Sequence, residues 1–250
     1  MSGGLEQAAY RLSPSLWVED ALGLQPDLWQ KEVLDASDDR MLLCCSRQSG
    51  KSTTTAALAL WTAIYKPKSL VLLLSPSLRQ SVELFRNVAG FYSQVADLAA
   101  PQSATLLRLE LENGSRIVSL PGKESTVRGF SKVALLIVDE AARVPDELYL
   151  AIRPMLAVSR GRLIALSTPW GRRGWFHNIW STPSGWRTWT IVADLCPRIS
   201  AEFLEEERQS MPKPWFEAEY YCKFNEPIDR IFGYDDILAS IDDNIEPLVV

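Results

Sequence analysis

Short apolar runs alternate along the chain with amphipathic segments, and this alternation limits the fold more than any other feature of the sequence. It is typical of βα units, in which parallel strands form a central sheet and the connecting helices cover its faces. Core strands are predicted at MLLCC (41–45), SLVLLLS (69–75), KVALLIVDE (132–140), RLIALSTP (162–169) and WRTWTIVAD (186–194). Helices are predicted over about 50–65 and 77–97. The fold class is therefore α/β with a mainly parallel sheet.

Two segments depart from this alternation. TLLRLELENGSRIVSLPG (105–122) alternates on either side of Asn-Gly, a strong hairpin signal, and predicts a β-hairpin insertion. The stretch ISAEFLEEERQSMPKPWFEAEYYCKF (199–224) predicts two short helices separated by MPKP, with Ser200 capping the first. We therefore expect a core over residues 1–195, followed by a small helical lid subdomain and a tail over 196–250.

Composition excludes several classes of protein. The chain has 250 residues and a net charge of −5, which argues against a protein that coats nucleic acid through bulk charge but leaves room for a local basic groove. Four cysteines without a CxxC pair and a single histidine argue against a disulfide framework, a zinc site and histidine-based catalysis. Without a signal peptide or an 18-residue apolar run, we expect a soluble intracellular protein with no membrane contact.

The stretch CCSRQSGKSTTTA (44–56) has the GKS ending of a phosphate-binding loop, although Cys45 stands where such a loop usually begins with glycine. GKS alone is common, and a capped helix start with a solvated lysine is the plainer alternative. Here it joins a predicted strand to a predicted helix, so that backbone N–H groups would converge on an anion. Lys51 would reach the β- and γ-phosphates, and Ser52 would hold Mg²⁺. The predicted phosphate-binding residues are Ser46, Arg47, Gln48, Ser49, Gly50, Lys51, Ser52 and Thr53.

The second chemical motif is ALLIVDE, which places Asp139 and Glu140 at the end of a strongly apolar strand. Open α/β sheets bind ligands at this end of their strands. Asp139 would bind Mg²⁺ through its water shell, and Glu140 would orient and polarise the water that attacks the γ-phosphate. By itself, a pair of carboxylates at a strand end is equally compatible with an ordinary loop. Together and in this order, the two motifs predict an ATP hydrolase that uses Mg²⁺.

Three motifs taken together, SRQSGKS, LIVDEAA and ALSTPWG, resemble the ATPase domain of the large terminase subunit, the DNA-packaging motor of tailed phages. The resemblance extends from about Pro26 to Phe232 and implies a P-loop NTPase fold of the RecA/ASCE type. Loops of that family often lack the first glycine, which would account for Cys45. The implied function is ATP hydrolysis coupled to translocation of double-stranded DNA into a procapsid.

The resemblance also implies roles for single residues, each with a plainer alternative. Gln30 would recognise adenine, or be an exposed helical glutamine. Arg128 in STVRGF would act as an arginine finger on a neighbouring subunit's nucleotide, or be a solvated loop residue. Ser167 and Thr168 in the STP motif would couple loss of the γ-phosphate to movement, or cap a strand end. Arg47 would lie along the phosphates as a catalytic charge, or hold the loop through a salt bridge.

The resemblance further implies partners. Arg172 and Arg173 in GRRGW would contact DNA phosphates, or be ordinary loop arginines. The family implies a ring, pentameric at the portal, a small terminase subunit as partner, and a location in the host cytoplasm with transient docking on the procapsid. A complete terminase also carries a nuclease domain; we expect none in this chain, which should not cut DNA, and we expect the late carboxylates within 235–243 to be solvated.

Three rival functions share part of this pattern. A superfamily-two helicase-like DNA translocase has the glutamine, the phosphate loop and an Asp-Glu pair, but such helicases place their arginines on a second RecA-like domain for which this chain has no room. A scaffold would bind nucleotide without hydrolysing it, and replacement of Glu140 by Gln separates it from a hydrolase. A kinase is least favoured, because nothing resembles an acceptor-binding lid.

Overall fold

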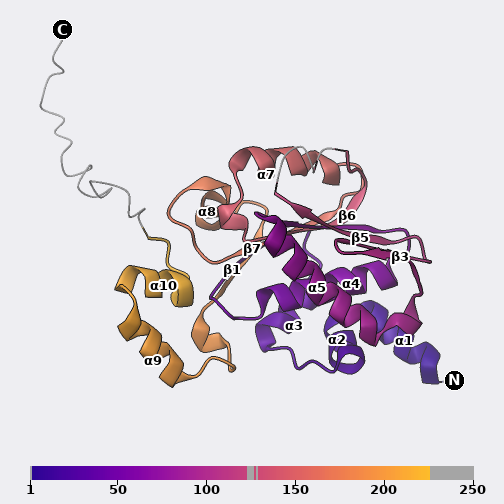
Figure 1. Ribbon diagram of the computed structural model, residues 1–250, viewed down its shortest axis with the longest axis horizontal. Helices are drawn as coiled ribbons and strands as arrows, with labels where there is room; N and C mark the ends of the chain where they lie inside the picture. The colour runs from indigo at the N-terminus through magenta and orange to yellow at the C-terminus, as the bar shows by residue number, and fades with distance from the viewer. Residues whose placement is uncertain (1, 123–126, 128, 226–250) are drawn as a thin grey trace, which may run out of the picture.

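The computed structural model describes residues 2–122, 127 and 129–225. The strands are β1 Arg40–Cys45, β2 Leu70–Ser75, β3 Pro101–Thr105, β4 Arg108–Leu111, β5 Arg116–Pro121, β6 Val133–Asp139, β7 Arg162–Ser167 and β8 Arg187–Ile191. Within the described residues they form one eight-stranded sheet in the order β3-β4-β5-β2-β6-β7-β1-β8 (Figure 1). The strands from β5 to β8 in this order run parallel, so the predicted mainly parallel sheet is confirmed.

The predicted hairpin is present, and it belongs to the central sheet. β4 and β5 are antiparallel on either side of Asn113-Gly114, while β5 also pairs in parallel with β2 and β3 adds a further antiparallel strand at the edge. The amide Nδ2 of Asn113 donates to the carbonyl oxygens of Ala63 (2.8 Å) and Ile64 (3.1 Å), near the end of α4 (Lys51–Tyr65). These hydrogen bonds attach the turn to the core, and the hairpin forms part of the central sheet.

Helices cover both faces of the sheet (Figure 1). On one side lie α1 Ser2–Leu12, α2 Pro14–Leu22, α3 Leu28–Asp35, α4 Lys51–Tyr65 and α5 Leu78–Gln94, and on the other lie α7 Asp146–Ile152 and α8 Gly174–Ser181. Successive side chains of a strand point to opposite faces of the sheet, so each strand contributes to both apolar layers. In β1, Met41 and Leu43 belong to the first layer, and Leu42 and Cys44 to the second.

The position of α4 follows from its composition. Its residues 54–63 are all buried, because the helix lies between the sheet and the helices α2, α3 and α5 and has no charged face to turn toward solvent. A helix enclosed on all sides has little freedom to shift. The place of its first turn, which carries Lys51 and Ser52, is therefore determined by the packing of the core.

After β8 the chain forms a helical pair, which comprises α9 (Ala201–Ser210) and α10 (Lys213–Tyr221). The hydroxyl of Ser200 accepts a hydrogen bond from the Phe203 N–H at 3.2 Å, which confirms the predicted cap. The backbone N–H of Arg47 donates to the carbonyl oxygen of Glu219 at 2.7 Å. The loop that follows β1 is therefore attached directly to α10.

Two further expectations from the sequence concern the cysteines and membrane-spanning helices. All four cysteines are buried and none forms a disulfide. Among the helices of the described residues, none combines the length and the apolar character that crossing a bilayer requires.

The start of β7 has no room for a side chain at Gly161. A methyl group there would lie 1.9 Å from the carbonyl oxygen of Val133, at the start of β6, and 2.9 Å from Cδ2 of Leu156. The close approach therefore brings the starts of the paired strands β6 and β7 together.

Replacing Gly161 by Ala should therefore lower the free energy of unfolding by about 1–3 kcal/mol, because the strands must separate to admit the methyl group. The matched control is Gly90→Ala in α5, where nothing lies within 4 Å of the added methyl group. The control should be neutral or stabilising by about 0.5–1 kcal/mol, because alanine favours a helix interior. Urea denaturation measures both values, and equal effects at the two positions would contradict the close approach.

Candidate nucleotide-binding site

The predicted site residues meet at the carboxyl edge of the sheet, where the adjacent strands β6, β7 and β1 end. β6 ends at Asp139, β7 ends at Ser167, and β1 continues into Ser46. Binding sites of open α/β sheets lie at this edge, because the connections to the following helices diverge there. The structure thus brings together motifs that are separated by about ninety residues of sequence.

The loop between β1 and α4 has the backbone conformation that a phosphate loop requires. Gln48 and Gly50 both have positive φ angles, of 54° and 90°. The Ser49 hydroxyl donates to the carbonyl oxygen of Ser46 at 3.0 Å and closes the turn. Gly50 forms the N-cap of α4 without a side-chain cap, so the first N–H groups of the helix face the loop, as anion binding requires.

Cys45 explains the missing first glycine. It is the last residue of β1, it is fully buried in the core, and burial raises the pKa of its thiol. The turn begins only at Ser46, so position 45 is a strand position and needs no glycine.

Lys51 is the buried cation of the site. Its Nζ lies 3.2 Å from Oε1 of Glu140, and the two side chains are 12% and 19% exposed. Burial by itself would lower the pKa of Lys51, but the carboxylates of Glu140 and Asp139 outweigh it and raise this pKa above its usual value. The ammonium group therefore stays charged at neutral pH, held between two carboxylates.

Asp139 lies beside Ser52, as expected for a shared metal. Its Oδ2 accepts a hydrogen bond from the Ser52 hydroxyl at 3.2 Å, and its Oδ1 accepts one from the Glu140 N–H at 3.0 Å. Burial raises the pKa of Asp139 to about 6, against the opposing effect of Lys51. A hydroxyl and a carboxylate at hydrogen-bonding distance are oxygen ligands of the kind that Mg²⁺ prefers, so these two residues fit the ion.

Glu140 has a strained backbone and two cationic neighbours. Its φ and ψ angles of 49° and 42° lie in the left-handed region, which few residues other than glycine occupy. Beyond Lys51, Nε of Arg143 lies 3.8 Å from Oε2 of Glu140. The guanidinium of Arg143 in turn stacks on the ring of Trp170 at 3.9 Å. A chain of contacts therefore runs from the carboxylate to the residue that follows Thr168-Pro169, and the sequence interpretation missed Arg143.

The hydroxyl groups beside Asp139 are buried. Ser167 and Thr168 are 0% and 4% exposed, and Ser75, at the end of β2, is 0% exposed. Among the described residues, nothing hydrogen-bonds the hydroxyls of Ser167 and Ser75. Since buried hydroxyl groups normally have a partner, these two are available to a ligand or to water at the strand ends. The sequence interpretation did not single out Ser75.

Arg47 forms an ion pair in this structure. Its side chain is 64% exposed, and its Nε lies 3.7 Å from Oε2 of Glu219 in α10. The geometry is thus the loop-holding salt bridge, one of the two predicted roles, and the role along the phosphates stays a prediction.

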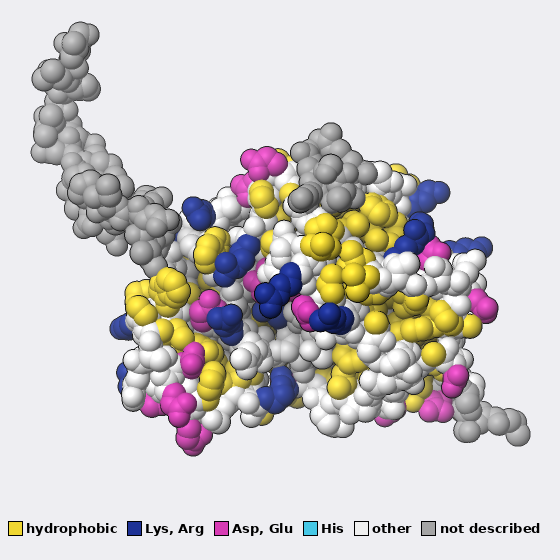
Figure 2. Space-filling model, in the orientation of Figure 1, with side chains coloured by type: hydrophobic (Ala, Val, Ile, Leu, Met, Phe, Trp, Pro, Cys, Tyr) yellow, Lys and Arg dark blue, Asp and Glu magenta, His cyan; other side chains and the backbone are white. Residues whose placement is uncertain are grey.

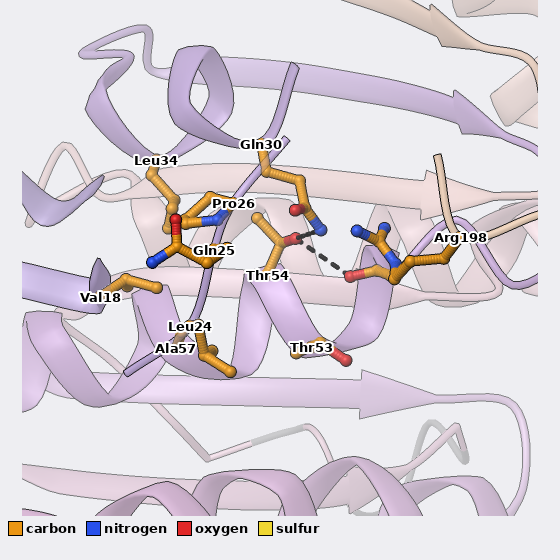
Figure 3. A pocket seen from close by; sticks show the side chains of 11 residues that line it. Val18, Leu24, Gln25, Pro26, Gln30, Leu34, Thr53, Thr54, Ala57 and Arg198 are labelled. Carbon is orange, nitrogen blue, oxygen red and sulfur yellow. Dashed lines mark hydrogen bonds between the residues drawn. The ribbon is translucent and has the colours of Figure 1, made fainter. Parts of the chain in front are cut away.

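Gln30 is buried beside the phosphate loop and lines a cavity of about 390 Å³ (Figure 3). Its Nε2 donates to the Thr54 hydroxyl at 2.9 Å, and its Oε1 accepts from the Asp27 N–H at 2.8 Å. A carboxamide has two N–H groups and two lone pairs on its oxygen, so one of each remains for a ligand. The cavity is lined by Val18, Leu24, Gln25, Pro26, Gln30, Leu34, Gly50, Thr53, Thr54, Ala57 and Arg198. Gln30 is not an exposed helical glutamine, and adenine recognition stays a prediction.

Residues 42–238 match the family model described as the T4likevirus-type terminase large subunit, N-terminal. This chain belongs to that family. The terminase large subunit of Thermus virus P23-45 is 29% identical to it over 196 residues, which are 71% of this chain and 40% of that protein. This chain therefore corresponds to less than half of that relative's length.

Solved terminase structures share the fold. The large terminase ATPase domain of Thermus phage P74-26 aligns with a TM-score of 0.76 at 24% identity, covering 86% of this chain and 100% of that domain. The large terminase of the thermophilic bacteriophage D6E, in complex with ADP, aligns with a TM-score of 0.66 at 15% identity, covering 80% of this chain and 54% of the other. The predicted P-loop fold is thereby confirmed.

The structure supports less about the residues that were predicted to contact DNA or a neighbouring subunit's nucleotide. Arg172 and Arg173 are exposed before α8, and Nε of Arg172 donates to the carbonyl oxygen of Phe224 at 3.1 Å. Figure 2 shows Lys and Arg side chains gathered across the middle of one face, beside the helical pair. Arg128 and the late carboxylates lie outside the described residues. DNA contact and the arginine finger stay predictions.

The pairing of Lys51 with Glu140 can be tested through stability. Lys51→Met should lower the free energy of unfolding by about 2–3 kcal/mol, because it leaves buried carboxylates without their cation. Adding Glu140→Gln should recover about 1 kcal/mol of that loss. The exposed pair Arg208–Glu205 is the control, and its coupling should stay below about 0.5 kcal/mol. Additive effects at positions 51 and 140 in urea denaturation would show that the pair does not form in solution.

Proposed function

We propose that this chain hydrolyses ATP to ADP and phosphate as the motor domain of a viral genome-packaging terminase, and that hydrolysis drives translocation of double-stranded DNA into a procapsid. The observation that carries this proposal is the arrangement of Lys51 and Glu140 at 3.2 Å, with Asp139 and Ser52 beside them, at the carboxyl edge of the sheet. Family membership supports it, as does the D6E terminase, whose structures include complexes with ADP and with ATP-gamma-S.

The first step is binding of the triphosphate. The N–H groups of residues 48–50 and of the first turn of α4 would donate to the phosphate oxygens, which carry more negative charge than one carboxylate. Lys51 would leave its ion pair with Glu140 and bind the β- and γ-phosphates instead. Mg²⁺ would be held by Ser52 and Asp139, where it would neutralise charge on the phosphates.

The second step is hydrolysis. Once Lys51 has turned to the phosphates, the carboxylate of Glu140 is free to accept a hydrogen bond from a water and to draw off its proton as the oxygen attacks the γ-phosphorus. The bond from the γ-phosphorus to the bridging oxygen breaks, and ADP and inorganic phosphate result. In the structure, the ion pair with Lys51 holds this carboxylate in place.

The motor context is also proposed from the family. Rings assembled on the portal, a small terminase subunit and host-cytoplasmic assembly on the procapsid belong to this proposal. Arg172 and Arg173, which are exposed before α8, would contribute phosphate contacts to DNA. The helical pair would act as the lid, because α10 is attached to the phosphate loop through Arg47 and Glu219.

Glu140→Gln separates a hydrolase from a nucleotide-binding scaffold. It should lower kcat for ATP by about 10²-fold or more, because the amide cannot take the proton of the attacking water. The Kd for Mg-ATP, measured by calorimetry, should stay within about threefold of the wild-type value, because the contacts to the phosphates remain. Glu147→Gln, at an exposed position of α7, is the control and should leave both values unchanged. A wild-type protein that binds ATP without turnover would favour the scaffold.

The proposed arginine finger makes activity depend on subunit contact. The isolated chain should hydrolyse ATP slowly, and the rate per subunit should rise with protein concentration, because Arg128 of one subunit would complete the site of its neighbour. Arg128→Ala and Glu140→Gln should each be nearly inactive, whereas an equal mixture should recover activity. In that mixture, an intact Glu140 meets an intact Arg128 across the interface. A constant rate per subunit together with an inactive mixture would contradict action in trans.

A further inference from the structure

Arg198 joins three parts of the molecule that are distant in sequence. It lies between the 3₁₀ turn at Ala193–Leu195 and α9, just before the helical pair. Its Nη1 and Nη2 donate to the two carboxylate oxygens of Asp27 at 2.9 and 2.7 Å, and Nη2 also donates to the carbonyl oxygen of Ser49 at 2.9 Å. A guanidinium that holds a carboxylate with two parallel hydrogen bonds has a well-defined orientation.

Both partners of Arg198 belong to the nucleotide site. Asp27 is the N-cap of α3, and it shares a capping box with Gln30, the residue predicted to recognise adenine. Ser49 belongs to the phosphate loop. The residue that precedes the helical pair therefore contacts the helix that carries Gln30 and the loop that would bind the phosphates.

The two ends of the cavity next to these contacts differ in polarity (Figure 3). Apolar side chains, among them Val18, Leu24 and Leu34, line one end. Gln30 and Arg198 meet at the other end, above the first turn of α4. The ends match a ligand that has a flat apolar body and a polar edge, and a volume of about 390 Å³ lies within the range of small-molecule sites.

The cavity adjoins the phosphate loop at Gly50. A methyl group at this position would lie 2.8 Å from Nε2 of Gln30 and 3.3 Å from Nη2 of Arg198. Thr53 and Thr54, in the turn that follows Lys51, also line the cavity. A nucleotide whose phosphates occupy the loop would thus have its base and ribose next to Arg198.

We propose that Arg198 is a positioning and specificity-determining residue for the nucleoside end of the nucleotide. The segment before the helical pair contributes one wall of the cavity, and the guanidinium of Arg198 forms that wall. Its hydrogen bonds to Asp27 and Ser49 already attach this segment to the core, and the base and ribose would strengthen that attachment from the cavity side. The inference rests on the proposed function and adds to it the residue that distinguishes a nucleotide from a bare polyphosphate.

The chemistry of arginine supports this role. A guanidinium plane stacks well on an aromatic ring while its N–H groups remain bound at the edge, and lysine cannot do both. Arg198 has five N–H groups, of which three make the hydrogen bonds to Asp27 and Ser49. Its planar face and two N–H groups are left for the ligand.

The test compares ligands that share the phosphates and differ in the nucleoside. Binding of Mg-ATP, Mg-ADP and inorganic tripolyphosphate is measured by calorimetry on the wild-type chain and on Arg198→Ala. We expect the variant to bind ATP and ADP about 10-fold more weakly and tripolyphosphate within about twofold of wild type. In steady-state assays, KM for ATP should rise by a similar factor while kcat changes by less than about threefold.

Three further variants sharpen the result. Arg198→Lys should behave like Arg198→Ala, because it keeps the charge and loses the planar fork. Asp27→Asn keeps a good helix cap and should show a smaller loss for ATP with none for tripolyphosphate, which keeps the test usable if Arg198→Ala folds poorly. Arg208→Ala, an exposed arginine of α9 that pairs with Glu205, is the control and should leave every constant unchanged.

Two results would overturn the inference. Equal weakening of ATP and tripolyphosphate would mean that Arg198 acts only through the phosphate loop, and unchanged ATP binding would mean that it does not contact the nucleoside. Failure of the proposed function looks different: the wild-type chain would bind the ligands without hydrolysing ATP, and the comparison of binding constants would still decide the role of Arg198.

Discussion

Three charged groups lie together at the carboxyl edge of the sheet, where Asp139 is buried and Lys51 and Glu140 are mostly buried, and none of them could stay there alone. Lys51 enters from the first turn of an enclosed helix, and Asp139 and Glu140 enter from the end of a central strand. Removing such charges from water is unfavourable unless each is paired, so the ion pair at 3.2 Å is a condition for burying the site. Under the proposed function, the same condition would make the site responsive to nucleotide, because a triphosphate would offer Lys51 a stronger partner than Glu140.

The sheet and most of this site could be predicted from local sequence. Strands such as LVLLLS are buried on both faces and therefore consist of continuous apolar residues. Four of the five predicted core strands were found within two residues of their expected limits, and the fifth, β8, ends at Ile191 and not at residue 194. Strand ends of a parallel sheet lie along one edge, so the placement of Lys51 beside Glu140 followed once the two strands were recognised. Asn113-Gly114 predicted the turn correctly, although only its pairing partners show that the hairpin continues the central sheet.

The contacts that the sequence did not disclose are those between distant side chains. Arg143 stacks on Trp170, and Arg198 holds Asp27, across separations of 27 and 171 residues. No periodicity marks such residues, because an exposed arginine in a loop has the same local pattern whether or not it has a partner. Gln30 shows the same limit: its motif predicted a role, but only the fold shows that it is buried, caps α3 and lines a cavity beside the loop. These contacts connect the phosphate loop, the strand-end carboxylate and the helical pair.

The central claim is that one triphosphate lies between Lys51 and Glu140. The most direct measurement is a crystal structure of the chain with a nonhydrolysable ATP analogue and Mg²⁺. The account predicts that Nζ of Lys51 leaves its position 3.2 Å from Glu140 and contacts the terminal phosphates, with the ion bound by Ser52 and Asp139. A structure in which the analogue is bound elsewhere and the Lys51–Glu140 pair is intact would contradict it.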